Sequence, residues 1–111
     1  MNVIPTQLFA GYTFDSVADE IRIPRAALPG LTAAEANATT GNGMEVMRQI
    51  VEGASSSLSA LAPEAKPTKA SITKPNPSIA VGVGVAPGTL RQTYGLSFDL
   101  TPTGLEMATE S

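Results

Sequence analysis

The sequence predicts an α+β fold in which one amphipathic helix packs on a small antiparallel sheet, with the elements in the order β-β-α-β-β-β. Three observations lead to this class. They are a helical stripe of apolar residues in mid-chain, alternating polar and apolar residues on either side of it, and turn-forming residues at short intervals. A chain of 111 residues fits one domain, and we expect residues 1–111 to form it.

Two short β-prone segments, residues 8–14 and 20–23, begin the order. Residues 15–19 lie between them and have the composition and length of a hairpin loop. We therefore expect an antiparallel pair with Ile21 and Ile23 facing the core. A proline directly after the second segment should end it, because proline has no N–H for the ladder.

The main helix is predicted over residues 44–62. Asn42 with Glu45 three residues later is a helix start signal, and Thr32 with Glu35 makes a similar capping box for a single helical turn upstream. Apolar residues then recur at helical spacing and form one stripe. Its members are Met47, Ile50, Val51, Ala54, Leu58 and Leu61.

The second half of this helix contains weak helix formers, namely Gly53 and the run from Ser55 to Ser57. Each costs a few tenths to about one kcal/mol relative to a good helix former. Tertiary packing against a sheet must therefore hold this half in place. The small side chains would also let the helix lie close to that sheet.

Three strands are predicted after the helix, the first at residues 68–74. The second, residues 78–85, alternates strictly between branched aliphatic residues and alanine or glycine. Residues 86–89 have Pro and Gly at the central positions of a type II turn, and residues 90–100 alternate again to complete a hairpin. Because a type II turn splays a two-residue hairpin, a longer flexible loop fits this tip as well. Residues 101–111 should fray or lie on a partner.

The residue types that are missing exclude most catalytic chemistry. The chain has no cysteine and no histidine, which removes disulfides, thiolate chemistry, the commonest transition-metal ligand and the usual general base near neutral pH. We expect a protein that is not an enzyme, with no catalytic residue, no cofactor and no metal. Only five residues are aromatic, so the core should be a thin one of aliphatic side chains.

The charge pattern argues against nucleic acid as a partner. The net charge is −3, and the seven lysines and arginines are spread singly along the chain, so no basic patch is present to neutralise phosphates. No window reaches the roughly 18 apolar residues of a membrane span, and the first residues lack the pattern of a signal peptide. We expect a soluble, unprocessed protein without a membrane partner.

A glycine pattern near the tip of the predicted hairpin resembles a phosphate-binding loop. Gly82, Gly84 and Gly88 have a suggestive spacing, but Pro87 stands where the dinucleotide fingerprint needs glycine, and no helix follows. Glycines that let another backbone approach a sheet face are the better interpretation, and a flexible arm is the other.

Two groups of charged residues are candidates for other roles. Asp15, Asp19 and Glu20 could hold a hard cation, yet their spacing is not that of a calcium loop, so we expect solvated turn carboxylates. A polar hairpin tip also cannot desolvate one carboxylate enough for acid–base catalysis. Three arginines could face a partner, although solvated positions are commoner: Arg22, Arg25 and Arg48.

The hairpin of residues 78–100 is the predicted partner-binding element. Its first strand has valines on one face, bare glycine backbone on the other, and no Lys or Pro to protect its edge. Such an edge is a template for pairing with another chain. The predicted interface residues are Ile79, Val81, Gly82, Val83, Gly84, Val85, Arg91 and Tyr94.

The composition and several phrases of the sequence resemble small virion structural proteins of tailed bacteriophages, including cyanophages. The composition is rich in Ala, Gly, Thr and Pro and lacks Cys and His, and the glycine-rich hairpin ends in an exposed tail. The phrases are Tyr12-x-Phe14-Asp15, Ile21-x-Ile23-Pro24 and the segment from Leu28 to Ala36. The resemblance implies a capsid cement or decoration, neck, tail or baseplate component that binds copies of itself or a larger coat or tail protein.

By this resemblance the protein would be assembled in the host cytoplasm and located in the virion. The alternative is a small cellular adaptor or inhibitor that binds one partner enzyme. The two differ in stoichiometry, because a virion component is made in many copies and tends to form symmetric oligomers.

Overall fold

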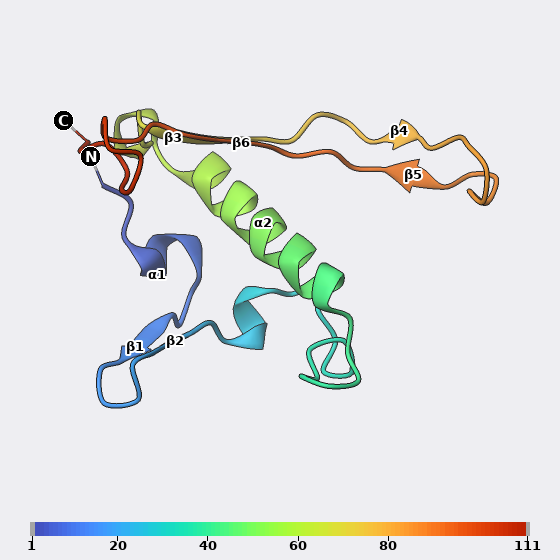
Figure 1. The fold of residues 1–111 in the computed structure, drawn as a ribbon, viewed down its shortest axis with the longest axis horizontal. Helices are drawn as coiled ribbons and strands as arrows, with labels where there is room; N and C mark the ends of the chain where they lie inside the picture. The colour runs from blue at the N-terminus through green and yellow to red at the C-terminus, as the bar shows by residue number, and fades with distance from the viewer. Residues whose placement is uncertain (1, 111) are drawn as a thin grey trace. The chain divides into compact units, whose positions relative to one another are not determined.

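The computed structural model describes residues 2–110 and confirms the α+β class, with one main helix and small antiparallel sheets (Figure 1). In place of one sheet, the described residues form three two-stranded ladders. The chain divides into two compact units. The first contains the residues up to Pro67 together with Glu110, and the second contains Thr68–Thr109. That residues 1–111 form one domain stays a prediction.

The first unit begins with a short helix, α1 (Pro5–Leu8), which overlaps the predicted first strand at Leu8. Proline suits the first helical position, and the Gln7 side chain accepts a hydrogen bond from the Ile4 N–H at 2.8 Å. Gly11, at φ +82°, then turns the chain. The strand predicted from residue 8 therefore begins only at Thr13.

The first hairpin is confirmed. Strands β1 (Thr13–Asp15) and β2 (Glu20–Arg22) pair antiparallel, with Phe14 opposite Ile21. The prediction that Ile21 faces the core is wrong, because its side chain is 64% exposed. Ile23 is half-buried. A ladder of three residues per strand offers too little surface to cover both faces.

The main helix, α2, runs from Gly43 to Ala60 and begins as predicted. The Asn42 Oδ1 accepts a hydrogen bond from the Glu45 N–H at 3.1 Å. Upstream, the predicted capping box is present, since the Glu35 carboxylate accepts from the Thr32 N–H and the Glu35 N–H donates to the Thr32 hydroxyl. A short helical turn, η1 (Arg25–Ala27), precedes it, and η2 (Pro63–Ala65) follows α2.

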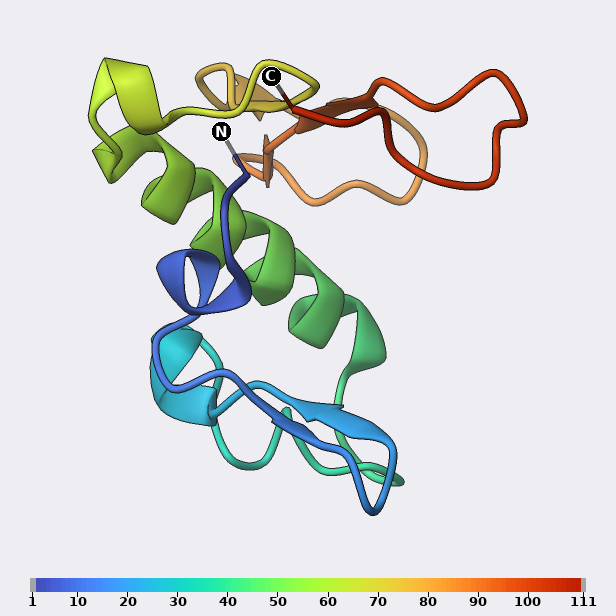
Figure 2. The same cartoon turned by 90° about the vertical axis from the view of Figure 1, so that its left-hand side faces the viewer.

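The core of the first unit lies where α2 meets α1 and the segments that follow it (Figure 2). The approach is close at Gly53, where a Cβ would lie in ordinary van der Waals contact with the Ala27 carbonyl oxygen, 3.5 Å away. One turn later, the Ser57 hydroxyl donates a hydrogen bond to the Leu8 carbonyl oxygen at 2.8 Å. The small residues therefore permit close packing against the N-terminal segments of the same unit. The buried residues here are Phe9, Leu28, Leu31, Gln49, Ala54 and Ser55.

The predicted apolar stripe is only part of the packed side of α2. Ala54 is buried, but Met47 is 57% exposed. The buried set instead includes Gln49 and Ser55, and Gln49 donates a hydrogen bond to the Glu45 carboxylate. Helical periodicity located the helix correctly but did not identify the side that is best covered.

The second unit is a long antiparallel ribbon. Strand β3 (Ala70–Thr73) pairs with β6 (Gly95–Phe98), and β4 (Ser78–Ile79) pairs with β5 (Leu90–Arg91). The predicted hairpin is thus present, and the strand predicted at residues 68–74 is paired with the returning strand (Figure 1).

The ribbon is interrupted between its two ladders by the sequence Pro75-Asn76-Pro77. Proline has no N–H to donate to a partner strand, so the ladder cannot continue there. The Gln92 side chain fills part of this gap by donating a hydrogen bond to the Pro75 carbonyl oxygen at 2.6 Å. The run predicted as one strand at residues 90–100 is consequently split into β5 and β6.

The strand predicted at residues 78–85 is wrong beyond Ile79. Gly82 and Gly84 have φ values of +146° and +80°, which glycine adopts readily and which end the extended run. Residues 80–89, here called the distal loop, are closed by a hydrogen bond from the Ala80 N–H to the Thr89 carbonyl oxygen at 2.8 Å. Gly88, at φ +82°, fits the predicted type II turn.

The last residues fold back rather than extend. An isolated bridge joins Leu100 to Met107, and the Ala108 N–H donates a hydrogen bond to the Asp99 carbonyl oxygen at 2.8 Å. A turn closed by the Thr101 carbonyl and the Gly104 N–H lies between them. The segment predicted to fray therefore has backbone hydrogen bonds over its described part. Its binding to a partner stays a prediction.

Candidate interaction surface

The second unit exposes nearly all of its large apolar side chains. In the distal loop, Val83 is 107% exposed and Val81 is 81% exposed. The smaller Ala80 is buried. Values near 100% mean that almost no other atom covers the side chain. Further exposed apolar residues lie along the ribbon and its end turn: Ile79, Leu90, Leu96, Phe98, Leu100, Leu105 and Met107.

The apolar residues of the β3–β6 ladder share one face. Opposite residues of an antiparallel pair project to the same side, so Ile72 with Leu96 and Ala70 with Phe98 form an apolar face. The other face carries serine, threonine and glycine. Leu96 and Phe98 remain 52% and 53% exposed. The ladder is therefore amphipathic, and its apolar face is only half covered.

The structure places most of the predicted interface residues at the far end of the ribbon. Ile79 ends β4, and Leu90, which the prediction missed, lies opposite it in β5. Val81, Gly82, Val83 and Gly84 are exposed in the distal loop, Val85 is half-buried, Arg91 is exposed in β5, and Tyr94 is half-buried between β5 and β6. They do not form the continuous strand edge that the sequence predicted. Their binding to a partner stays a prediction.

Sequence reasoning also missed Leu96 and Phe98 as candidates. The signal was present, since both belong to the alternating run of residues 90–100. Alternation marks a strand with one apolar face. It does not say whether the same chain covers that face.

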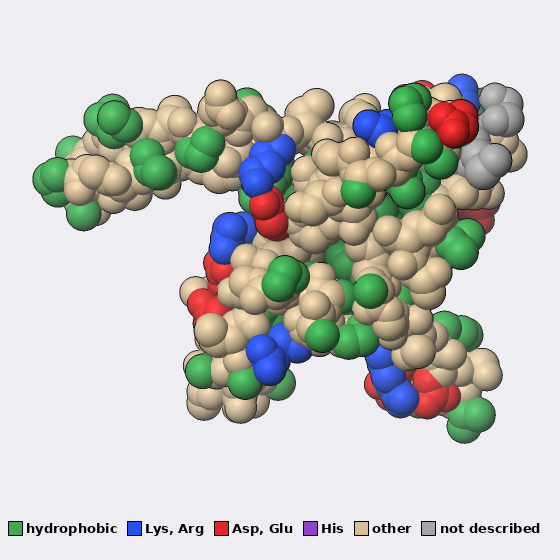
Figure 3. All heavy atoms as spheres, turned by 180° about the vertical axis from the view of Figure 1, so that it is seen from behind, with side chains coloured by type: hydrophobic (Ala, Val, Ile, Leu, Met, Phe, Trp, Pro, Cys, Tyr) green, Lys and Arg blue, Asp and Glu red, His purple; other side chains and the backbone are tan. Residues whose placement is uncertain are grey.

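Charges are divided unevenly along the chain. Residues 68–98 contain Lys69, Lys74 and Arg91 and no carboxylate, and residues 75–90 contain no charged residue at all. Figure 3 shows hydrophobic side chains around this end of the ribbon with no charged ones among them. The first unit, by contrast, carries eight of the ten carboxylates and four of the seven cations.

The acidic loop of the first hairpin has a structural role. The Asp15 Oδ1 accepts hydrogen bonds from the N–H groups of Val17 and Ala18, and its Oδ2 pairs with Arg22 at 2.9 Å. Asp19 adopts a left-handed φ of +56° in the same loop. Among residues 2–110, no cluster of three or more carboxylates is placed to hold a metal ion.

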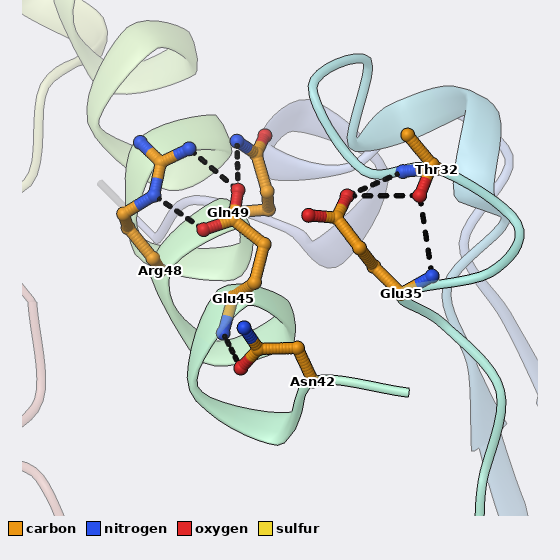
Figure 4. Close-up of polar contacts among 6 residues, drawn as sticks. All are labelled: Thr32, Glu35, Asn42, Glu45, Arg48 and Gln49. Carbon is orange, nitrogen blue, oxygen red and sulfur yellow. Dashed lines mark hydrogen bonds and ion pairs between the residues drawn. The ribbon is translucent and has the colours of Figure 1, made fainter. Parts of the chain in front are cut away.

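The three arginines considered as partner-facing charges all have partners within the first unit. Besides the pairing of Arg22 with Asp15, the Arg25 guanidinium donates to the Leu31 carbonyl oxygen at 3.1 Å. Arg48 makes two hydrogen bonds to the Glu45 carboxylate at 2.8 and 2.6 Å (Figure 4). These bonds to Arg48 hold the pKa of Glu45 below its ordinary value of 4.5, against a smaller opposing effect of burial.

A shallow depression of about 580 Å³ lies in the first unit between α2 and the N-terminal segments. Its walls are made mainly of small or apolar residues, including Ala10, Ala26, Pro29, Gly53 and Ser56. Two charged side chains, Arg48 and Glu52, also line it. Its walls therefore combine small and apolar residues with a few polar side chains.

The accessible surface is large for a chain of this size. It measures 7,980 Å², whereas a folded monomer of 11.4 kDa is expected to expose about 5,800 Å². If the two units are treated as separate small proteins, the same relation gives about 6,900 Å² in total. Even this higher reference falls roughly 1,000 Å² short of the surface that the chain exposes.

No protein-family model, curated protein or solved structure matches the chain. None of the helices within residues 2–110 combines the length and the apolar character that crossing a membrane requires. The features that bear on function are therefore the exposed ribbon, the charge division and the depression on the first unit.

Proposed function

We propose that this chain is a structural component of a phage virion that acts by protein–protein assembly, with copies of itself or with a larger coat or tail protein. The observation that supports assembly most directly is the accessible surface of 7,980 Å², which exceeds by roughly 1,000 Å² the surface expected even for two separate small proteins of these sizes. Monomeric proteins rarely expose large contiguous apolar patches, and the second unit exposes most of its large apolar side chains.

The ribbon itself needs a further layer. An isolated two-stranded hairpin is marginally stable in water, and a third strand or a covering element is usually required. Here Leu96 and Phe98 are half exposed on the apolar face, and Val83 is fully exposed at the far end. A partner that covers these side chains would supply the missing layer.

The virion setting is supported by the resemblance of composition and of the phrases around Tyr12, Ile21 and Leu28. A cement, decoration, neck, tail or baseplate protein is repeated many times in a particle, which suits a small chain whose stability depends on neighbours. The chain has neither histidine nor cysteine, and the proposed function involves no catalytic step.

Sedimentation velocity of the purified chain over a wide concentration range tests assembly. We expect species larger than the monomer that grow with concentration. A strict monomer throughout would contradict self-assembly. A monomer that forms a one-to-one complex with a single cellular enzyme would support the adaptor alternative instead.

The neighbouring reading frames test the virion setting separately. Genes for capsid or tail proteins beside this one would support it. A neighbourhood of cellular metabolic or regulatory genes would contradict it, whatever the sedimentation result.

A further inference from the structure

We propose that copies of this chain assemble head to tail, with the ribbon of one copy (residues 68–100) docked on the first unit of the next copy. This inference rests on the proposed assembly function and specifies which surfaces meet. The far end of the ribbon, with the distal loop, is the inserting part. The depression between α2 and the N-terminal segments is the receiving part.

Charge favours contact between ribbon and first unit over contact between two ribbons. The ribbon, residues 68–100, carries three cations and one carboxylate, Asp99, whereas the first unit carries eight carboxylates and four cations. Two ribbons placed side by side would bring like charges together. A ribbon on the first unit brings opposite net charges together, which steers and orients association.

The far end of the ribbon and the depression on the first unit also match in shape and polarity. The far end of the ribbon presents Ile79, Val81, Val83 and Leu90, each at least 65% exposed, and lacks charge over residues 75–90. It therefore needs an apolar site. The depression of about 580 Å³ is lined by Leu8 and by alanine, glycine, proline and serine residues, which leave room for branched side chains, and by the polar side chains of Arg48, Gln49 and Glu52. Arg48 is already paired with Glu45.

A head-to-tail arrangement needs area for two contacts per chain. A standard interface covers about 800 Å² on each partner. In a head-to-tail arrangement each chain contributes its ribbon to one neighbour and its first unit to another, so about 1,600 Å² of each chain would be covered. The excess over two separate small proteins, roughly 1,000 Å², corresponds to more than half of this area.

The inserting end is tested with Val83→Asp in the full chain. Because Val83 is 107% exposed, the substitution leaves the fold intact, and we expect the dissociation constant for assembly to rise about tenfold or more. The matched control is Val17→Asp, since Val17 is 96% exposed but lies in the loop of the first hairpin. Equal assembly by both variants would overturn the proposal.

The receiving site is tested with Ser56→Arg. Ser56 is exposed on α2 and lines the depression, and arginine is a better helix former than serine, so the helix should persist. We expect a loss of assembly of about tenfold or more, whereas Ser59→Arg, an exposed position of α2 outside the depression, should assemble normally. Normal assembly by Ser56→Arg would show that the ribbon docks elsewhere.

Mixing Val83→Asp with Ser56→Arg tests whether the arrangement is head to tail. In a head-to-tail assembly, the intact ribbon of the Ser56→Arg copy docks on the intact first unit of the Val83→Asp copy, so the mixture forms a complex that neither variant forms alone. The absence of a complex in the mixture would overturn the head-to-tail arrangement.

If the unmodified chain assembles but these variants do not behave as expected, only this inference fails. If the unmodified chain never assembles with itself, this inference and the self-assembly part of the proposed function both fail, and binding to a larger coat or tail protein is the part that is left.

Discussion

At the start of α2, a few neighbouring side chains determine where the helix begins. Asn42 caps the helix by accepting the Glu45 N–H, and the Glu45 carboxylate then binds Arg48 and Gln49 one turn on. All four groups lie within eight residues of sequence. The spacing alone predicted the cap, because capping and i, i+3 contacts depend only on local backbone geometry.

Stability should depend on the ionisation of Glu45. Its pKa is lowered in the folded state by the hydrogen bonds from Arg48, so the carboxylate contributes stability that is fully present above pH 4.5, its ordinary pKa. This contribution is lost as the pH falls through the lowered value. We expect Glu45→Gln to be less stable than the unmodified chain at pH 7 and equally stable near pH 2, measured by urea unfolding followed by circular dichroism.

The control for this experiment is Glu64→Gln, which changes an exposed carboxylate in η2. This variant leaves the pair of Glu45 with Arg48 in place, so it shows how much the loss of one carboxylate by itself changes stability at each pH. A pH-independent deficit for Glu45→Gln would mean that the carboxylate acts through shape rather than charge.

Among the elements, the loop that leads into α2 depends on a close backbone approach. A Cβ on Gly41 would lie within 3 Å of the Glu35 and Asn37 carbonyl oxygens, whereas a Cβ on Gly43 would meet nothing within 4 Å. The Gly41 N–H also donates a hydrogen bond to the Asn37 carbonyl oxygen at 3.0 Å. The two glycines stand two residues apart and have opposite surroundings.

We therefore expect Gly41→Ala to lower the free energy of unfolding by about 1–3 kcal/mol, because backbone atoms must move to admit the methyl group. Gly43→Ala should be neutral or stabilising by up to about 1 kcal/mol, since Gly43 is helical and alanine favours the helix. Thermal unfolding followed at 222 nm distinguishes them. Equal melting temperatures would show that the loop relaxes without cost.

In the ribbon, by contrast, the local sequence pattern did not predict the structure. Strict alternation over residues 78–85 predicted one strand, but Gly82 and Gly84 take positive φ values and the strand ends at Ile79. Alternation tells which side a side chain would take in an extended chain. It does not supply the partner that makes extension favourable, and among the described residues the cross-strand pairing beyond Ile79 ends with the hydrogen bond from the Ala80 N–H to the Thr89 carbonyl oxygen.

For the whole molecule, assembly should appear as a stability that depends on concentration. A partner that binds only the folded chain stabilises it by mass action. We expect the melting temperature of the unmodified chain to rise by about 5 °C or more over a hundredfold increase in concentration. Differential scanning calorimetry over that range measures it.

Val83→Asp is the control for this measurement, because it should weaken the concentration dependence while leaving the melting temperature of the dilute protein unchanged. An unmodified chain with a constant melting temperature would contradict the view that neighbours complete its core.

The sequence by itself determined the α+β class, the first hairpin, the cap and extent of α2, and the turn at residues 86–89. These features depend on contacts between residues close in sequence, which composition and spacing encode directly. Only the tertiary structure decided that Ile21 is exposed, that α2 packs closely through Gly53 and Ser57, and that the ribbon leaves Val81 and Val83 uncovered. Burial depends on which distant segments meet, and no local pattern fixes that.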